Sequence, residues 1–228
     1  MSDPRRKAQT AKLGSDTHDM IVFAFGDGVN GYLAAFAADR LYKLVDCPLC
    51  ETMGSLVGHG VYWRKPRDGE RGYWIPIRRW LCKSCGHTVS ALPDFLLRYR
   101  WYVLEVVSGV IVKRAEAIIA WRELGAAAAG YPHVRTMQRW WQSVGGEAVR
   151  WLGAMETALA QQDSNSAWLD PQGEAAHTQT PVQALLHAAG HLLAWGKTRW
   201  EELTQYGWKD RLRFLWLWGS GRGLGRLV

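Results

Sequence analysis

The apolar positions of this chain change their period twice, which predicts a short β region between two helical regions. Over residues 17–45 they recur at roughly helical spacing around Gly26-Asp27-Gly28, so we expect two short helices or one kinked helix there. Residues 55–63 and 73–81 are typical of strands, and the second stretch alternates in polarity. Pro76 lies in that second strand and cannot donate to a ladder, which predicts an edge strand.

The two strands are joined by a turn-forming segment. Residues 65–72 contain Pro66, Asp68-Gly69 and Gly72, which predict a hairpin turn. Leu92-Pro93 then ends the β region, and Asp94 is placed to cap a helix that follows it.

Helical spacing dominates the rest of the chain. Helices are predicted at 95–112, 114–124, 133–144, 146–161, 181–195, 198–205 and 208–218. We expect Gly125 to close the second of these, Pro132 to open the third, and Gly145-Gly146 to end it. The predicted fold class is α+β and mostly α, with a small four-cysteine zinc ribbon built on a β-hairpin and packed with a multi-helix, helix-turn-helix-like domain.

These elements divide the chain into seven parts. They are a disordered basic arm (1–16), N-terminal helices (17–45), the four-cysteine ribbon (46–93), a helical helix-turn-helix-like domain (94–162), a polar linker (163–180), Trp-rich C-terminal helices (181–218) and a mobile Gly/Arg tail (219–228).

All four cysteines lie in two C-x-x-C turns, Cys47/Cys50 and Cys82/Cys85, with 31 residues (51–81) between them. Two such turns joined by a hairpin can direct four thiolates at one tetrahedral ion, so we predict one structural Zn²⁺. The alternatives are two redox pairs or an iron–sulfur cluster, but a redox pair usually opens a helix and neither turn does. A four-cysteine zinc site has no open position, so it would stabilise the fold without catalysing a reaction.

Composition narrows the class of partner. The 228 residues are 48% hydrophobic, enough for a buried core, and carry a formal charge of +7 at pH 7. The charge favours a polyanionic partner, nucleic acid before membrane. Residues 1–16 lack the apolar core of a signal peptide, and the longest apolar run is about half the ~20 residues that span a bilayer. We therefore expect a cytoplasmic, nucleoid-associated protein with no membrane partner.

The hairpin between the cysteine pairs is basic and aromatic. Its cations are predicted to contact the DNA backbone: Arg64, Lys65, Arg67, Arg71, Arg78, Arg79 and Lys83. Interleaved with them are Tyr62, Trp63, Tyr73, Trp74 and Trp80. Such aromatics can stack on bases, but a small ribbon also needs a core, and we expect them to form that core.

The predicted helix at 133–144 has two distinct sides. Val134, Met137, Trp141 and Val144 form an apolar stripe. The opposite side carries residues suited to bidentate contacts with guanine and adenine edges: Arg135, Gln138, Arg139 and Gln142. With Thr136 as a further backbone contact and the helix at 114–124 before it, the pattern predicts a helix-turn-helix that reads double-stranded DNA, although its turn is longer than usual. The alternative is an ordinary amphipathic helix with a solvated face.

The sequence contains no complete motif of a known catalytic site. His187 and His191 share a helix face, but Ala188 stands where a metalloprotease needs glutamate, so we expect both to line a partly buried face. Nothing resembles a nucleophile elbow or a phosphate-binding loop. We therefore predict that the chain is not an enzyme.

Five short motifs follow one another along the chain: C-P-L-C (47–50), His59-Gly60, I-R-R-W-L-C-K-S-C (77–85), Leu92-Pro93 and T-M-Q-R-W-W (136–141). With them, residues 46–145 resemble the N-terminal zinc-ribbon and helix-turn-helix region of bacterial insertion-sequence transposases. Those enzymes continue into a catalytic domain in which carboxylates on an RNase H-like sheet hold two metal ions. Here only 83 residues remain (228 − 145), and they are typical of helix.

The resemblance thus implies the DNA-binding half of such an enzyme without the cutting half. We expect an accessory, targeting or regulatory factor of a bacterial transposon or insertion element. The alternative is a protein–protein adaptor that docks a transposase, an ATPase or another copy of itself through the ribbon and the tryptophan-rich C-terminal helices.

Overall fold

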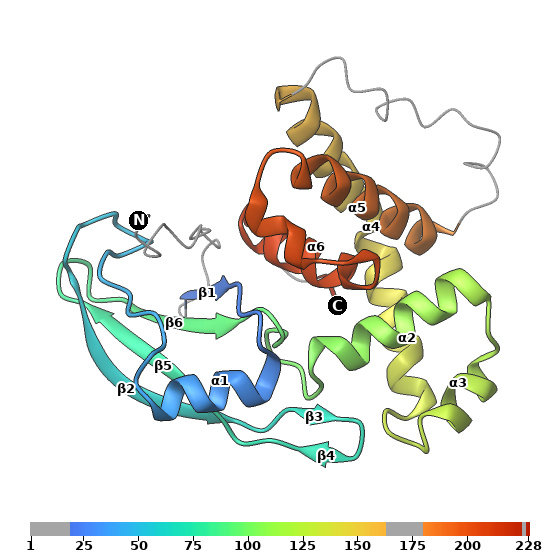
Figure 1. Ribbon diagram of the computed structural model, residues 1–228, viewed down its shortest axis with the longest axis horizontal. Helices are drawn as coiled ribbons and strands as arrows, with labels where there is room; N and C mark the ends of the chain where they lie inside the picture. The colour runs from blue at the N-terminus through green and yellow to red at the C-terminus, as the bar shows by residue number, and fades with distance from the viewer. Residues whose placement is uncertain (1–18, 163–179, 225–226) are drawn as a thin grey trace. The chain divides into compact units, whose positions relative to one another are not determined.

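The computed structural model describes residues 19–162, 180–224 and 227–228 (Figure 1). They form two compact units. The first contains the described residues up to Leu104 and those of 216–224, and the second contains the described residues of 105–215 together with Leu227 and Val228. The fold is mixed α+β and mostly helical, as predicted. The predicted arm (1–16) and nearly all of the predicted linker (163–179) lie outside the described residues.

The first unit is built on a four-stranded sheet in the order β1-β6-β5-β2. The strands are β1 (Asp19–Phe23), β2 (Leu56–Arg64), β5 (Ile75–Cys82) and β6 (Thr88–Pro93). β5 pairs antiparallel with β2 and β6, whereas β1 runs parallel to β6. The two predicted strands are therefore β2 and β5, and β6 adds a third strand after the second cysteine turn.

The helix expected at the start of residues 17–45 is wrong, because β1 occupies 19–23. The apolar run at 20–25, with β-branched Ile21 and Val22, suits a strand, but six residues have no decisive period. Its partner decides the outcome, since Ile21 pairs with Ala91 of β6 about 70 residues away and both are buried. The helical expectation holds only for α1 (Gly28–Ala37).

The edge position predicted for β5 is also wrong, because β5 lies between β6 and β2. Pro76 is tolerated for a local reason. β6 pairs only with Arg79–Leu81 of β5, so the strand has a ladder partner at Pro76 on the β2 side alone. The carbonyl of Pro76 accepts a hydrogen bond from Tyr32 of α1 at 2.8 Å instead (α1 lies beside this sheet in Figure 1).

The predicted hairpin turn is present as a small separate ladder. β3 (Arg67–Asp68) pairs with β4 (Arg71–Gly72), and Gly69 between them has φ +61°. A bulge in β2 shifts the register with β5 between Gly58 and Val61. Gly60 takes φ +96° there, a conformation that favours glycine.

The first predicted helix begins later than expected. Residues 95–103 form turns and isolated bridges, and α2 spans Leu104–Ala117. Phe95, Leu96 and Leu97 are all buried, so the start of this segment lacks the solvent-facing side of an amphipathic helix. Asp94 is not a helix cap but a buried residue whose carboxylate accepts a hydrogen bond from the Phe25 backbone at 3.1 Å.

The second unit holds most of the remaining helices. They are α3 (Trp121–Ala127), α4 (Val134–Gln162), α5 (Pro181–Lys197) and the 3₁₀ turns η3 (Glu201–Gln205) and η4 (Trp208–Asp210). α6 (Arg211–Ser220) follows, and its residues up to Leu215 belong to this unit. α5 packs along α4. Thr180 and Gln183 form a capping box at the start of α5, and this matches the predicted helix.

The predicted break at Gly145-Gly146 is wrong, because α4 continues through both residues to Gln162. Two glycines in a helix interior cost about 1 kcal/mol each relative to alanine. The buried stripe continues on both sides of them and offsets that cost: Met137, Trp140, Val144, Ala148, Trp151, Met155 and Leu159.

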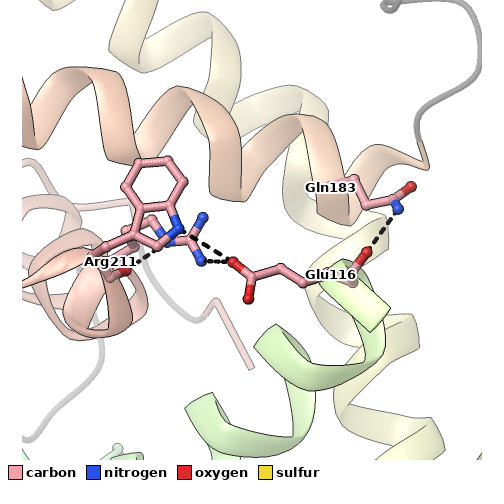
Figure 2. A network of polar contacts seen from close by, with 5 residues as sticks. Glu116, Gln183 and Arg211 are labelled. Atoms are coloured by element: carbon pink, nitrogen blue, oxygen red, sulfur yellow. Dashed lines mark hydrogen bonds and ion pairs between the residues drawn. The ribbon is translucent and has the colours of Figure 1, made fainter. Parts of the chain in front are cut away.

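Polar contacts hold the end of α2 to the C-terminal helices of the same unit. Figure 2 shows Glu116 between Arg211 and Gln183. The Glu116 carboxylate pairs with the buried guanidinium of Arg211 and accepts a hydrogen bond from the indole of Trp208 at 3.3 Å. Gln183 donates to the carbonyl of Ala115 at 2.7 Å, so α2 is tied to both α5 and α6.

The predicted mobile tail at 219–228 needs correction. Gly219 and Ser220 complete α6, Ser220 is buried, and so are Leu227 and Val228 at the end of the chain. Burial of Leu227 and Val228 stabilises the folded chain, and the Gly/Arg composition of the segment gives no indication of it.

Candidate metal centre and nucleic-acid interface

The first cysteine turn precedes β2, and the second follows β5. Backbone hydrogen bonds close each turn, from Glu51 to Cys47 at 2.9 Å and from Gly86 to Cys82 at 3.0 Å. Gly86 takes φ +74° at the point where the second turn reverses. A further backbone bond, from Lys83 to the carbonyl of Ser55 at 2.9 Å, ties the second turn to the start of β2.

The four sulfurs meet at one point, as predicted. All of them lie within 4.8 Å of one another, and they form the only group of three or more His, Cys, Asp or Glu ligands among the described residues. Two sulfur pairs are 3.8 Å (Cys47 to Cys85) and 3.6 Å (Cys50 to Cys82) apart. A tetrahedral ion with metal–sulfur bonds of ~2.3 Å holds its sulfurs about 3.8 Å apart. The cluster is therefore sized for one tetrahedral metal ion.

The surroundings of the four thiols shift their pKa values in opposite directions. A hydrogen bond with Ser55 lowers the pKa of Cys82 to about 5, and contacts with Thr52 lower the pKa of Cys50. Burial raises the pKa of Cys47. At Cys85 a backbone hydrogen bond from His87 acts in the opposite direction, but burial and the neighbouring thiols still raise the pKa to about 12. Four adjacent thiolates repel one another, and a bound cation removes that repulsion.

The metal site belongs to the core of the sheet. Cys47 and Cys82 are buried in one cluster with Ile21, Leu44 and Trp80. β1 and β6 contribute to this cluster, although neither was predicted as a strand. The alternation of Val89 and Ala91 with Thr88 and Ser90 is the signal that would have revealed β6.

The seven predicted backbone-binding cations fall into two groups. Three of them form hydrogen bonds or an ion pair that hold them to other parts of the first unit. Arg64 donates to the carbonyls of Leu97 at 2.9 Å and Arg100 at 2.6 Å. Arg78 pairs with Asp39, and Arg79 donates to the Thr88 hydroxyl at 3.4 Å. By contrast Lys65, Arg71 and Lys83 are exposed, and Arg67 is half-buried.

The expectation that the ribbon aromatics form its core is right for Trp80, which is 5% exposed. It is wrong for Trp63 and Trp74, which are 58% and 59% exposed. Tyr62 and Tyr73 are half-buried. The aromatics of the hairpin therefore divide between the metal-site core and the surface.

α4 presents the predicted readout residues on its exposed side. Arg135, Arg139 and Gln142 are exposed, whereas Gln138 and Thr136 are half-buried. The buried stripe opposite them contains Trp140 in place of the predicted Trp141, which is half-buried. Pro132 does not open the helix as predicted, because α4 begins at Val134. His133 caps it, since its Nδ1 accepts a hydrogen bond from the Arg135 backbone at 3.2 Å.

The helix that precedes α4 is α3 at 121–127, not a helix at 114–124. Gly125 lies inside α3 and does not close it. A Cβ on Gly125 would lie 2.3 Å from a methyl of Val134, so the glycine allows α3 to approach the start of α4 closely. The Arg114 guanidinium lies 5.0 Å from the Trp121 ring, which contacts Trp141 at 6.1 Å. These contacts hold α2, α3 and α4 together.

The histidine pair and the C-terminal tryptophans are weaker candidates for a metal site and a docking surface. His187 and His191 are exposed, which corrects their expected partial burial, and their Nε2 atoms are 3.4 Å apart with no third ligand joining them in the described chain. The C-terminal tryptophans are largely engaged. Trp216 is buried, Trp195 contacts Trp200 at 5.4 Å, and the Arg211 guanidinium lies 3.8 Å from the Trp208 ring.

No helix in the described ranges has the length and hydropathy to cross a bilayer.

The fold and the cysteine cluster together define an α+β protein with a four-cysteine metal ribbon. Residues 47–140 match a family described as a domain of unknown function (DUF6431). The match begins at the first cysteine and ends in α4, so it includes all four cysteines, β2 to β6, α2 and α3. No curated protein and no solved structure matches the chain.

Proposed function

We propose that this chain is a zinc-stabilised protein that binds double-stranded DNA and reads its bases with the first turns of α4. The observation that carries the proposal is the exposed side of α4. Arg135, Arg139 and Gln142 lie one turn apart from each other on that side, opposite a fully buried stripe. No acidic residue occurs from 134 to 146. Arginine and glutamine are the side chains that make bidentate contacts with guanine and adenine edges in a major groove.

The placement of these arginines supports an anionic partner. The N-terminus of a helix carries partial positive charge, so arginines in its first turns are mildly unfavourable for the helix itself. The same arrangement adds two side-chain charges to the positive end of the helix dipole. A DNA phosphate near this end would be favoured by both contributions.

Zinc is the ion that best suits the cysteine site. Four thiolates at tetrahedral spacing match its preferred ligands and geometry, and no position is left for a substrate. The four cysteines would hold the ion, and the ion would neutralise their charge and fix the two turns beside β2 and β5. Its role would be structural.

The exposed cations of the ribbon are the best candidates for phosphate contacts. They are Lys65, Arg71 and Lys83. Arg64, Arg78 and Arg79 already have partners within the unit, so we assign them a structural role in place of the predicted phosphate contact. The proposed biological role is that of an accessory, targeting or regulatory factor of a mobile element. It rests on the resemblance of residues 46–145 to transposase DNA-binding regions, a stretch that nearly coincides with the family match at 47–140.

The test is selection of bound sequences from a random duplex pool with the metal-loaded full chain, followed by Arg139→Ala. We expect the variant to lose about 1–3 kcal/mol of binding free energy on the selected duplex and much less on random duplex. Arg150→Ala is the matched control, because Arg150 is an exposed arginine of the same helix that lies beyond the readout turns and pairs with Glu147.

Two results would count against the assignment. Equal losses on selected and random duplex would make Arg139 a backbone contact only. Failure of the metal-loaded chain to retain any duplex would remove the DNA-binding proposal itself.

A further inference from the structure

The surface of the ribbon that carries Trp63 and Trp74 has an unusual composition. Trp63 lies opposite Pro76 in the β2–β5 ladder, and Arg64 lies opposite Ile75. Lys65 and Trp74 are the next residues beyond this last pair, and the Lys65 ammonium lies 4.9 Å from the centroid of the Trp74 ring. Residues two apart on an extended segment share a face, so Lys65 continues the side of Trp63, and its contact with the Trp74 ring brings Trp74 to the same side. We call these three residues the aromatic–cationic face.

Trp63 and Trp74 are exposed, although the same hairpin is able to bury a tryptophan. The same hairpin buries Trp80 at 5% exposure but leaves Trp63 and Trp74 at 58% and 59%. Burial of an aromatic side chain contributes a few kcal/mol, so two tryptophans left in water at neighbouring positions forgo a substantial stabilisation. Clustered exposed aromatics of this kind mark binding surfaces.

Further aromatic residues and cations lie in the hairpin or next to it. The Arg71 guanidinium lies 5.0 Å from the Tyr73 ring. Trp101 is 72% exposed, and its carbonyl accepts a hydrogen bond from the backbone of Arg67 at 2.6 Å, beside the hairpin. The two acidic residues of the hairpin, Asp68 and Glu70, lie at its tip, away from the pairing of Lys65 with Trp74.

This combination of groups matches one ligand chemistry better than others. Indole rings stack on nucleic-acid bases, and ammonium or guanidinium groups beside the rings contact the flanking phosphates. In a duplex the faces of each base are covered by its neighbours in the stack. The ligand must therefore offer unstacked bases on a charged backbone, which describes a single-stranded nucleic acid.

We propose that the aromatic–cationic face binds single-stranded DNA by stacking its bases on Trp63 and Trp74. The inference deepens the proposed function and rests on it only in taking DNA as the polyanion. It adds a second substrate form, unpaired strands, at a site in the first unit that is separate from α4.

The test uses the metal-loaded full chain and a short labelled oligothymidine, with binding followed by fluorescence anisotropy. Trp63→Ala and Trp74→Ala should each weaken binding about 5- to 150-fold, the range expected for loss of one stacked base. Trp63→Phe should retain most of the affinity, because a ring remains. Lys65→Gln should reduce the slope of log affinity against log salt by about 0.7, the value for one phosphate contact on a single strand.

Tyr42→Ala is the matched control, since Tyr42 is an exposed aromatic (52%) of the same unit outside the hairpin. It should leave binding unchanged, and all variants should keep the metal content of the wild type.

The two proposals fail separately. If the Trp63→Ala and Trp74→Ala variants bind the oligonucleotide as tightly as the wild type, the stacking site is wrong. The stacking site is also wrong if the wild type selects duplexes but binds no single strand. In that case the proposed duplex-binding function is still supported. If a proline-rich peptide binds the face and the oligonucleotide does not, the partner is a protein and the inference is overturned. If the double variant Arg135→Ala/Arg139→Ala loses duplex but keeps the oligonucleotide, both assignments are supported.

Discussion

Arg64 and Arg211 have structural roles that their charge does not suggest. Arg64 donates to two backbone carbonyls in the segment 95–103, and burial lowers the pKa of its guanidinium. These hydrogen bonds satisfy two backbone carbonyls in a segment that has no helix to satisfy them. Arg211 is buried against Glu116 and the ring of Trp208. A basic composition therefore overstates the charge available to a partner.

The Arg211 site gives a prediction at the scale of single residues. Glu116→Gln would leave a buried guanidinium without its counter-charge, while its contacts with the Trp208 ring and carbonyl remain. Because Glu116 is itself 49% exposed, solvent compensates in part, and we expect a loss of about 1–3 kcal/mol in the free energy of unfolding. Urea unfolding followed by circular dichroism measures it.

Glu147→Gln is the control for this prediction. Glu147 forms a surface ion pair with Arg150 three residues away on α4. Its removal should change the unfolding free energy by less than about 0.5 kcal/mol. Equal effects of the two substitutions would show that the buried arginine does not depend on its carboxylate.

At the scale of elements, the α3–α4 pair depends on a close approach at Gly125. Gly125→Ala would place a methyl group 2.3 Å from a side-chain carbon of Val134. The two helices would have to separate, and we expect a loss of about 1–3 kcal/mol in unfolding free energy. Since the contact includes the first residue of α4, the substitution should also weaken duplex binding if the proposed function is correct.

Gly146→Ala is the opposite case on a neighbouring element. Gly146 lies inside α4, and nothing lies within 4 Å of the position of an added Cβ. Alanine is the better helix former by about 1 kcal/mol, so this substitution should stabilise the protein. Thermal unfolding of both variants checks the pair, and destabilisation by Gly146→Ala would contradict the continuous α4.

At the scale of the whole molecule, the two units should respond differently to loss of the metal. The cysteine cluster is part of the core of the first unit, whereas α3 to α5 belong to the second. Chelation should therefore open residues 46–93 to proteolysis and change the far-ultraviolet circular dichroism of the helices only slightly. Cys82→Ser should reproduce this state and lower the metal content from about one ion per chain.

Ser84→Ala is the control, because Ser84 lies exposed in the same turn as Cys82 and is not a ligand. It should keep both the metal and the protection from proteases. Loss of the helical signal together with the ribbon would instead show that the two units unfold as one.

Features that depend on local spacing could be predicted from the sequence alone. The two C-x-x-C turns and the hairpin between them predict the cysteine cluster, because a short turn directs both of its thiols to the same point. Thr180, Pro181 and Gln183 predict the start of α5 through a cap that needs only four residues. The exposed side of α4 follows from the period of its apolar stripe.

Only the tertiary structure decided the features that depend on distant partners. β1 is a strand because β6 pairs with it, and α4 passes through two glycines because the buried stripe continues beyond them. The ribbon cations could be divided into those held within the unit and those exposed only once their distant partners were placed. Arg64 contacts carbonyls in the segment 95–103, and Arg78 contacts Asp39, whereas Lys65, Arg71 and Lys83 are exposed. The burial of Trp80 and the exposure of Trp63 and Trp74 likewise depended on which face of each strand the core covers. Local spacing determines which atoms can meet within a turn, whereas pairing and burial determine which of the remaining side chains are left for a partner.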